Sequence, residues 1–181
     1  SLQVVAAPSV TVAPLKYTCW FHGDCIADYY HIPVFSEEHW RAMKSQIQMA
    51  ADYGQTMILT PIFTQPLDTA IGWERTTIQL VDVVKNDDVY SFGFDKLTRF
   101  IKMCQECGIL YFEISHLFTQ WGGRCCPKVM AAVDGEYKKI FGWEQEALSD
   151  EYKAFLSAFL PQLIHYLDEH GISKCTYFHL T

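Results

Sequence analysis

The fold is decided by residues 109–116, ILYFEISH, a short apolar run that ends in a serine and a histidine. A run of this length bounded by turn signals is typical of a fully buried strand. Gly108 precedes it and marks the end of a helical pattern that begins near Asp95. The apolar face of that pattern consists of Leu97, Phe100, Ile101 and Cys104. The stretch predicts a helix followed by a buried strand, as in parallel α/β folds.

The same unit recurs on both sides of this stretch. Tyr17–Phe21 and Thr56–Thr60 predict two earlier strands, and Cys175–Leu180 predicts a fourth. Ser36 is the expected N-cap of the first helix, and Ser149 is the expected N-cap of the last. The order βαβαβαβ implies a parallel sheet with right-handed crossovers.

Two hairpins interrupt this alternation. The second is predicted by Asp134-Gly135, a strong two-residue turn signal. The strands of the first hairpin are expected at Thr77–Val84 and Val89–Phe94, and those of the second at Lys128–Val133 and Glu136–Phe141. Within the last helix, Pro161 removes one backbone hydrogen bond, so we expect a kink or two abutting segments there.

Two architectures share this order, the doubly wound sheet and the eight-stranded barrel. Residues 22–25, HGDC, lack the G-x-G-x-x-G loop typical of the former, whereas long loops after the strands favour the latter. A complete barrel needs about 250 residues, so four strands cannot close one. We predict a partial (β/α)8, TIM-like barrel over residues 16–181, with about four parallel strands, three helices and two inserted β-hairpins. Residues 1–15 are expected to be a linker or the end of a preceding domain.

Composition excludes several classes of function. The chain has 181 residues, a formal charge of −7 and no basic stripe, so nucleic-acid binding is not expected. Its longest mainly apolar stretch, Ala154–Ile164, is too short to cross a membrane, which takes about 18–20 residues. Seven cysteines without a disulfide pattern favour a reducing compartment such as the cytoplasm, although export stays open.

Polar side chains stand where the predicted strands end, the place where parallel α/β folds carry their sites. Three of the four strands end close to a histidine. The selected residues are His22, Asp24, Thr60, His116 and His179. Each could instead cap a helix or anchor a loop, but their shared position favours a binding site.

The loop after His116 adds Gln120 and Trp121. An indole near amide and imidazole groups suits a pyranose, which offers an apolar face and a rim of hydroxyls. The alternative is that Trp121 only holds a long loop on the rim of the barrel.

A metal site is the competing interpretation. Cys104 and Cys107 form a single C-x-x-C, and Cys125 and Cys126 are adjacent, whereas structural zinc normally needs two such pairs. We therefore expect no metal and no cofactor. A catalytic metal held by His22, Asp24 and His116 is the alternative that stays open.

Carboxylates are scarce at the strand ends. Glycoside hydrolysis usually takes a pair of them. The available ones are Asp28, expected in a loop, and Glu113, expected inside a strand. We therefore assign no catalytic residue within the chain.

Four segments carry a family resemblance: residues 20–30 (WFHGDCIADYY), 115–122 (SHLFTQWG), 133–137 (VDGEY) and 177–181 (YFHLT). Together they resemble the catalytic domain of glycoside hydrolase family 123, in its N-terminal half only. The resemblance implies a β-N-acetylgalactosaminidase-like barrel after a β-sandwich, which residues 1–15 would end. It also implies substrate contacts at His22, Asp24, His116, Gln120 and Trp121.

The resemblance further implies the chemistry. In the family the acetamido group of the substrate attacks the anomeric carbon, a retaining mechanism assisted by an Asp-Glu pair. That pair is expected just after Thr181, so the chain alone is expected to be inactive. A non-catalytic carbohydrate-binding module is the second hypothesis. The open sheet edges also predict self-association, unless the N-terminal segment covers them.

Overall fold

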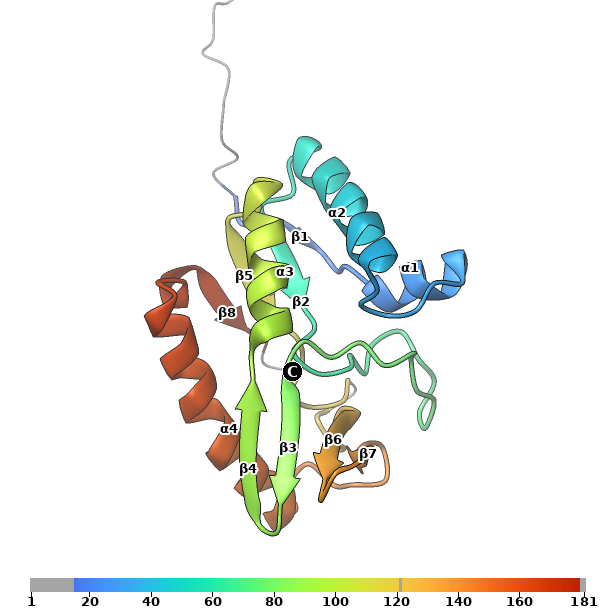
Figure 1. The fold of residues 1–181 in the computed structure, drawn as a ribbon, viewed down its shortest axis with the longest axis vertical. Helices are drawn as coiled ribbons and strands as arrows, with labels where there is room; N and C mark the ends of the chain where they lie inside the picture. The colour runs from blue at the N-terminus through green and yellow to red at the C-terminus, as the bar shows by residue number, and fades with distance from the viewer. Residues whose placement is uncertain (1–14, 121, 180–181) are drawn as a thin grey trace, which may run out of the picture.

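The chain alternates helices and parallel strands, as Figure 1 shows for the computed structural model, which describes residues 15–120 and 122–179. The main sheet consists of β1 (Thr18–Cys19), β2 (Met57–Thr60), β5 (Tyr111–Ile114) and β8 (Thr176–Phe178). All neighbours pair in parallel, in the order β1-β2-β5-β8. The order follows the chain, as in successive strands of a barrel, whereas a doubly wound sheet reverses direction. The four predicted parallel strands are confirmed, while residues 1–14 and the predicted strand end at Leu180 lie outside the described residues.

Four α-helices accompany this sheet, one more than predicted. They are α1 (Gly23–Tyr30), α2 (Glu37–Asp52), α3 (Asp95–Glu106) and α4 (Asp150–Glu169), with a short 3-10 turn at Ser173–Cys175. The prediction that Asp28 lies in a loop after β1 is wrong, because α1 begins at Gly23 and includes Asp28. Its first residue is glycine and its N-cap makes no side-chain bond, so local signals of a helix are weak. The helix packs on α2 instead, where His39 Nε2 contacts the Gly23 carbonyl oxygen at 2.8 Å.

The N-terminus of α2 is capped as predicted. Ser36 accepts a hydrogen bond from the His39 backbone N–H at 3.2 Å. Ser36→Ala should lower the free energy of unfolding by about 1 kcal/mol, since one orphan donor of the first turn loses its partner. Ser45→Ala is the matched control, because Ser45 lies exposed inside the same helix and should change little. Urea denaturation measures both; equal losses would contradict the capping role.

The two predicted hairpins join into a second sheet. Its strands are β3 (Asp82–Asn86), β4 (Val89–Gly93), β6 (Val129–Val133) and β7 (Glu136–Phe141). The order is β4-β3-β6-β7, and β3 pairs with β6 in parallel, which links the loops after β2 and β5. The Asp134-Gly135 turn is confirmed: both residues have positive φ, 50° and 87°, as a tight hairpin turn requires.

One boundary of the first hairpin was predicted wrongly. The strand expected from Thr77 begins only at Asp82. The backbone N–H groups of Leu80 and Val81 bond instead to the carbonyls of Pro61 and Ile62. The apolar run before β3 is thus buried as loop rather than as strand.

The second sheet packs on α4 through aromatic side chains. Phe92 lies 5.0 Å from Phe159 and Phe141 lies 5.1 Å from Phe155, measured between ring centroids. Despite Pro161, α4 is a single helix, so of the two predicted alternatives, a kink or two abutting segments, the second is wrong. The proline lies on the exposed side, where water can satisfy the freed carbonyl.

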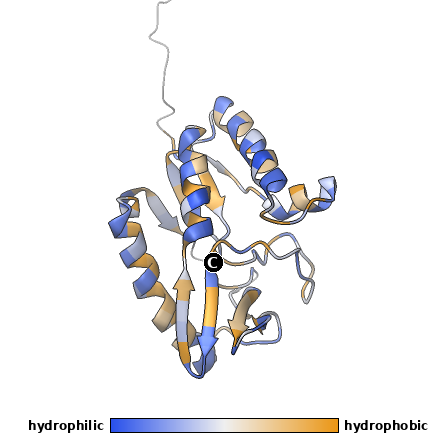
Figure 2. Cartoon of the chain, in the orientation of Figure 1, coloured by the Kyte–Doolittle hydropathy of each residue, from blue (hydrophilic) through white to orange (hydrophobic). Residues whose placement is uncertain are grey.

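Burial follows the predicted patterns. Figure 2 shows hydrophobic residues concentrated in β2, and every residue of that strand is buried. The predicted face of α3 lies in the core, with Leu97, Phe100 and Cys104 almost fully covered. Among the described residues, no helix is both long and apolar enough to cross a membrane.

Candidate functional site

The carboxyl ends of β1, β5 and β8 bring four side chains together, which we call the strand-end cluster: Trp20, Glu113, His116 and His179. The rings of His116 and His179 lie 3.7 Å apart between centroids. Trp20 meets both edge-on, at 5.5 Å from His116 and 5.9 Å from His179. The structure thus brings together two of the predicted histidines, from strands far apart in the sequence.

Glu113 orients His179. Its carboxylate is buried in β5, and Oε1 lies 2.8 Å from His179 Nδ1, so the imidazole donates its Nδ1–H. Nε2 is then the ring nitrogen of His179 that is left for another partner. The other carboxylate oxygen, Oε2, has no partner among the described residues.

His116 is held neutral at ordinary pH. His116 is 3% exposed, and burial together with the neighbouring His179 lowers its pKa to about 4. Its Nδ1 is buried and has no hydrogen-bond partner in the described part of the chain. Buried polar atoms are almost always satisfied, so an unpaired imidazole nitrogen next to an exposed indole points to a bound polar molecule or water.

The pKa of His116 has a consequence for stability. In the unfolded chain the imidazole of His116 binds its proton near pH 6.5, whereas in the folded chain it does so only near pH 4. Between these pH values the unfolded state binds more protons, so the free energy of unfolding should fall as the pH drops from 6.5 to 4. We expect a loss of up to about 3 kcal/mol between pH 7 and pH 4 from this residue. Urea denaturation of the chain and of His116→Gln measures it, and the variant should show a flatter profile. His165→Gln, at an exposed position of α4, is the control and should keep the original slope.

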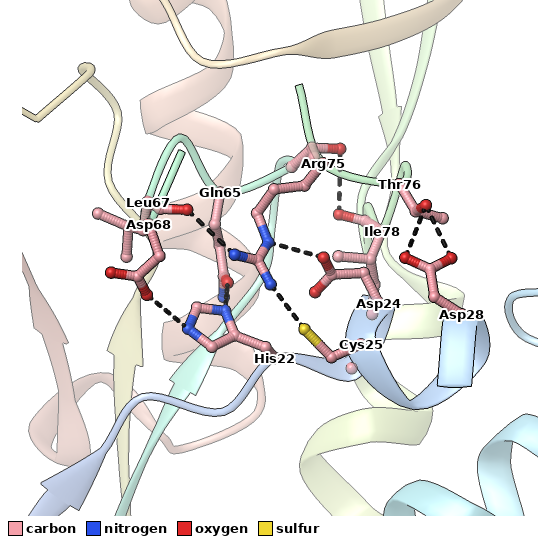
Figure 3. A network of polar contacts seen from close by, with 12 residues as sticks. His22, Asp24, Cys25, Asp28, Gln65, Leu67, Asp68, Arg75, Thr76 and Ile78 are labelled. Carbon is pink, nitrogen blue, oxygen red and sulfur yellow. Dashed lines mark hydrogen bonds and ion pairs between the residues drawn. The ribbon is translucent and has the colours of Figure 1, made fainter. Parts of the chain in front are cut away.

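A second network follows β1, shown in Figure 3, and we call it the loop anchor: His22, Asp24, Gln65, Asp68 and Arg75. Asp24 is 2% exposed and accepts from Arg75 Nε at 2.6 Å. His22 contacts Gln65 Oε1 through Nδ1 at 2.9 Å and Asp68 through Nε2 at 3.1 Å. These bonds tie the β2–β3 loop to the start of α1.

Asp24 therefore lies against a guanidinium and not on an open surface. Arg75 also donates to the Leu67 carbonyl at 3.1 Å, so one side chain joins two parts of the loop to Asp24. Next to Asp24, a Cβ on Gly23 would come within 2.6 Å of Ile78 Cδ1, so a larger residue there would have to displace the Ile78 side chain.

The other predicted residues lie elsewhere. Thr60 is fully buried and donates its hydroxyl to the Ile58 carbonyl at 3.3 Å, so its side chain is closed to solvent. Gln120 lines a separate cavity farther along the β5–β6 loop. Trp121 lies outside the described residues.

The trio required for a catalytic metal does not assemble. His22 and Asp24 are engaged in the loop anchor, whereas His116 lies in the strand-end cluster. Within residues 15–120 and 122–179, no three His, Cys, Asp or Glu side chains stand close enough to hold a metal ion. Cys104 and Cys107 lie in or against the core, and burial raises the pKa of both thiols, which disfavours a thiolate site.

Sequence reasoning missed Trp20, Gln65, Asp68 and Arg75 as parts of these networks. Trp20 directly follows β1, and the other three lie in the loop after β2, so the strand-end rule could have selected Trp20 and Gln65. Arg75 carries no such signal, because a long irregular loop brings it back to Asp24.

Comparisons with known proteins identify the family of the chain. The model of the glycoside hydrolase 123 catalytic domain matches residues 20–181. The chain belongs to glycoside hydrolase family 123. The comparison with curated proteins gave no match.

A solved family 123 glycoside hydrolase from Clostridium perfringens shares the fold with a TM-score of 0.66 and 17% sequence identity. That structure was reported for the details of glycolipid glycan hydrolysis. The similarity covers 89% of this family 123 chain but 28% of the solved one, so this chain spans about a quarter of its length.

Proposed function

We propose that this chain forms the substrate-binding wall of a retaining glycoside hydrolase that removes terminal β-linked N-acetylhexosamine. It would be the N-terminal half of a (β/α)8 barrel, with the catalytic Asp-Glu pair supplied just after Thr181. The observation that carries the proposal is the strand-end cluster, an exposed indole beside two imidazoles at the ends of three parallel strands.

The chemistry of the cluster suits a neutral sugar. Trp20 is 42% exposed and offers apolar surface to a pyranose face. His116 and His179 offer imidazole nitrogen atoms for hydroxyl or amide groups, and Glu113 holds His179 through Nδ1. In this proposal Asp24 acts through Arg75 to position the loop, and His22 acts with it in the loop anchor. Contacts of the substrate with Gln120 and Trp121 stay predictions from the family resemblance.

The cluster also lies where a catalytic pair after β8 would act. His179 directly follows β8, so residues that come next in the chain extend from the same edge of the sheet. The acetamido group would then be the nucleophile, and the family's Glu would protonate the departing oxygen. The residues of this chain bind and orient the sugar.

The test is hydrolysis by a chain extended past Thr181, assayed on aryl N-acetyl-β-galactosaminide and N-acetyl-β-glucosaminide. We expect release of the aryl alcohol from at least the first. If the extended protein is folded and turns over neither substrate, the proposed activity is wrong, and a non-catalytic carbohydrate-binding module becomes the better account.

A further inference from the structure

The second sheet ends at β7, whose outer edge is open (Figure 1). The strand pairs with β6 on one side, and within residues 15–120 and 122–179 nothing bonds to its backbone on the other. Such an edge presents unpaired N–H and C=O groups to another strand. We propose that it binds the same edge of a second copy of the chain, which joins two four-stranded sheets into one. The inference does not depend on the proposed function.

The sequence of β7 is complementary to itself. In an antiparallel pair centred on Tyr137, Glu136 of each copy lies opposite Lys138 of the other. Opposite charges at directly opposed positions stabilise such a pair, whereas like charges destabilise it. A pair centred on Lys138 would place two lysines opposite each other, so the charges select the register centred on Tyr137.

The side chains that would meet are exposed in the single chain. Those of Glu136 and Lys138 are 77% and 48% exposed and lie 3.7 Å apart along their own strand. Tyr137 is 64% exposed. Because successive side chains of a strand point to opposite faces, Tyr137 lies on the other face from Glu136 and Lys138. The two tyrosine rings would therefore meet on one face of the joined sheet, and two ion pairs would form on the other.

Lysines on an edge strand usually prevent this kind of pairing, because it would leave their charges without a partner. Both lysines of β7 are compensated. Lys139 Nζ bonds within its own chain to Glu74 at 2.6 Å and to Glu144 at 2.9 Å. Lys138 would face Glu136 of the second copy. The edge therefore carries no charge that the proposed pairing leaves unmatched.

A groove beside the edge adds apolar surface. It is a cavity of about 510 Å³ between the second sheet and the start of α4, where Val133, Ile140 and Phe141 line it next to Lys138. The groove thus lies on the face that would carry the ion pairs. The aliphatic stems of the paired lysines can pack along its rim while their charged ends stay in water. Pairing would then bury apolar area in addition to backbone groups.

Sedimentation equilibrium of the 181-residue chain tests the pairing. We expect the apparent mass to rise with protein concentration from that of one chain toward that of two. The rise should be smaller at high salt, because ions screen charge pairs that stay in contact with water. A chain that is still monomeric at about 1 mM, the weak end of specific binding, would overturn the inference.

Charge reversals distinguish this edge from the open edges of the main sheet. Glu136→Lys and Lys138→Glu each place like charges opposite one another, and each should weaken self-association at least about tenfold. At these two positions the first variant carries two positive charges and the second carries two negative ones. An equimolar mixture of the two variants should therefore associate again, as a heterodimer with both ion pairs restored.

Glu169→Lys is the matched control, because it reverses an exposed charge at the end of α4 and should leave self-association unchanged. Circular dichroism checks that each variant is folded. Association that neither reversal on β7 weakens would overturn the inference and point to the edges of the main sheet. Loss in both variants without recovery in their mixture would also overturn it, since the two positions would then not face each other.

Discussion

The 181-residue chain alone is expected to hydrolyse aryl N-acetyl-β-galactosaminide slower than a chain extended past Thr181, by a factor on the order of 10²–10⁴. General acid–base catalysis contributes about this much, and the carboxylates near the described strand ends are already engaged. Glu113 pairs with His179, and Asp24 pairs with Arg75.

Release of the aryl alcohol at equal protein concentration measures this difference. Circular dichroism of both proteins is the control, because an unfolded chain would also be inactive. Equal rates would contradict the account, since they would place a catalytic carboxylate within residues 1–181.

Asp24→Ala should lower the free energy of unfolding by about 3–5 kcal/mol, the usual cost of removing one partner of a buried ion pair. The side chains of Asp24 and Arg75 are 3% and 10% exposed, so water cannot replace the lost carboxylate around the guanidinium. The β2–β3 loop should loosen as well, because Arg75 holds it through the Leu67 carbonyl.

Urea denaturation measures this loss, and Asp28→Ala is its matched control. Asp28 lies in the same helix and is exposed, and among the described contacts its carboxylate accepts only from the Thr76 hydroxyl. Its removal should therefore cost less than about 1 kcal/mol. Comparable losses in both variants would contradict the role of the buried pair.

The regular elements could be predicted where local signals were strong. The apolar run at 109–116 contains β5, Ser36 caps α2, and Asp134-Gly135 forms a tight turn. These features were predictable because burial, capping and positive φ depend on only a few neighbouring residues. α1 was missed because its stability comes from packing on α2 rather than from its own sequence.

The site could be predicted only in part, for a related reason. Position after a strand was enough to select His116 and His179, whose rings do meet. The same rule selected Asp24 and Thr60, whose surroundings it could not describe. Whether a polar side chain at a strand end faces solvent depends on partners such as Arg75, 51 residues away in the chain.

The central claim is that the strand-end cluster binds a terminal N-acetylhexosamine, and NMR titration of the 181-residue chain tests it most directly. We predict that methyl N-acetyl-β-galactosaminide shifts the indole signal of Trp20 in a saturable way. His179→Ala should abolish this shift and His165→Ala should leave it intact. An unchanged Trp20 signal at saturating sugar, with the chain folded, would contradict the account.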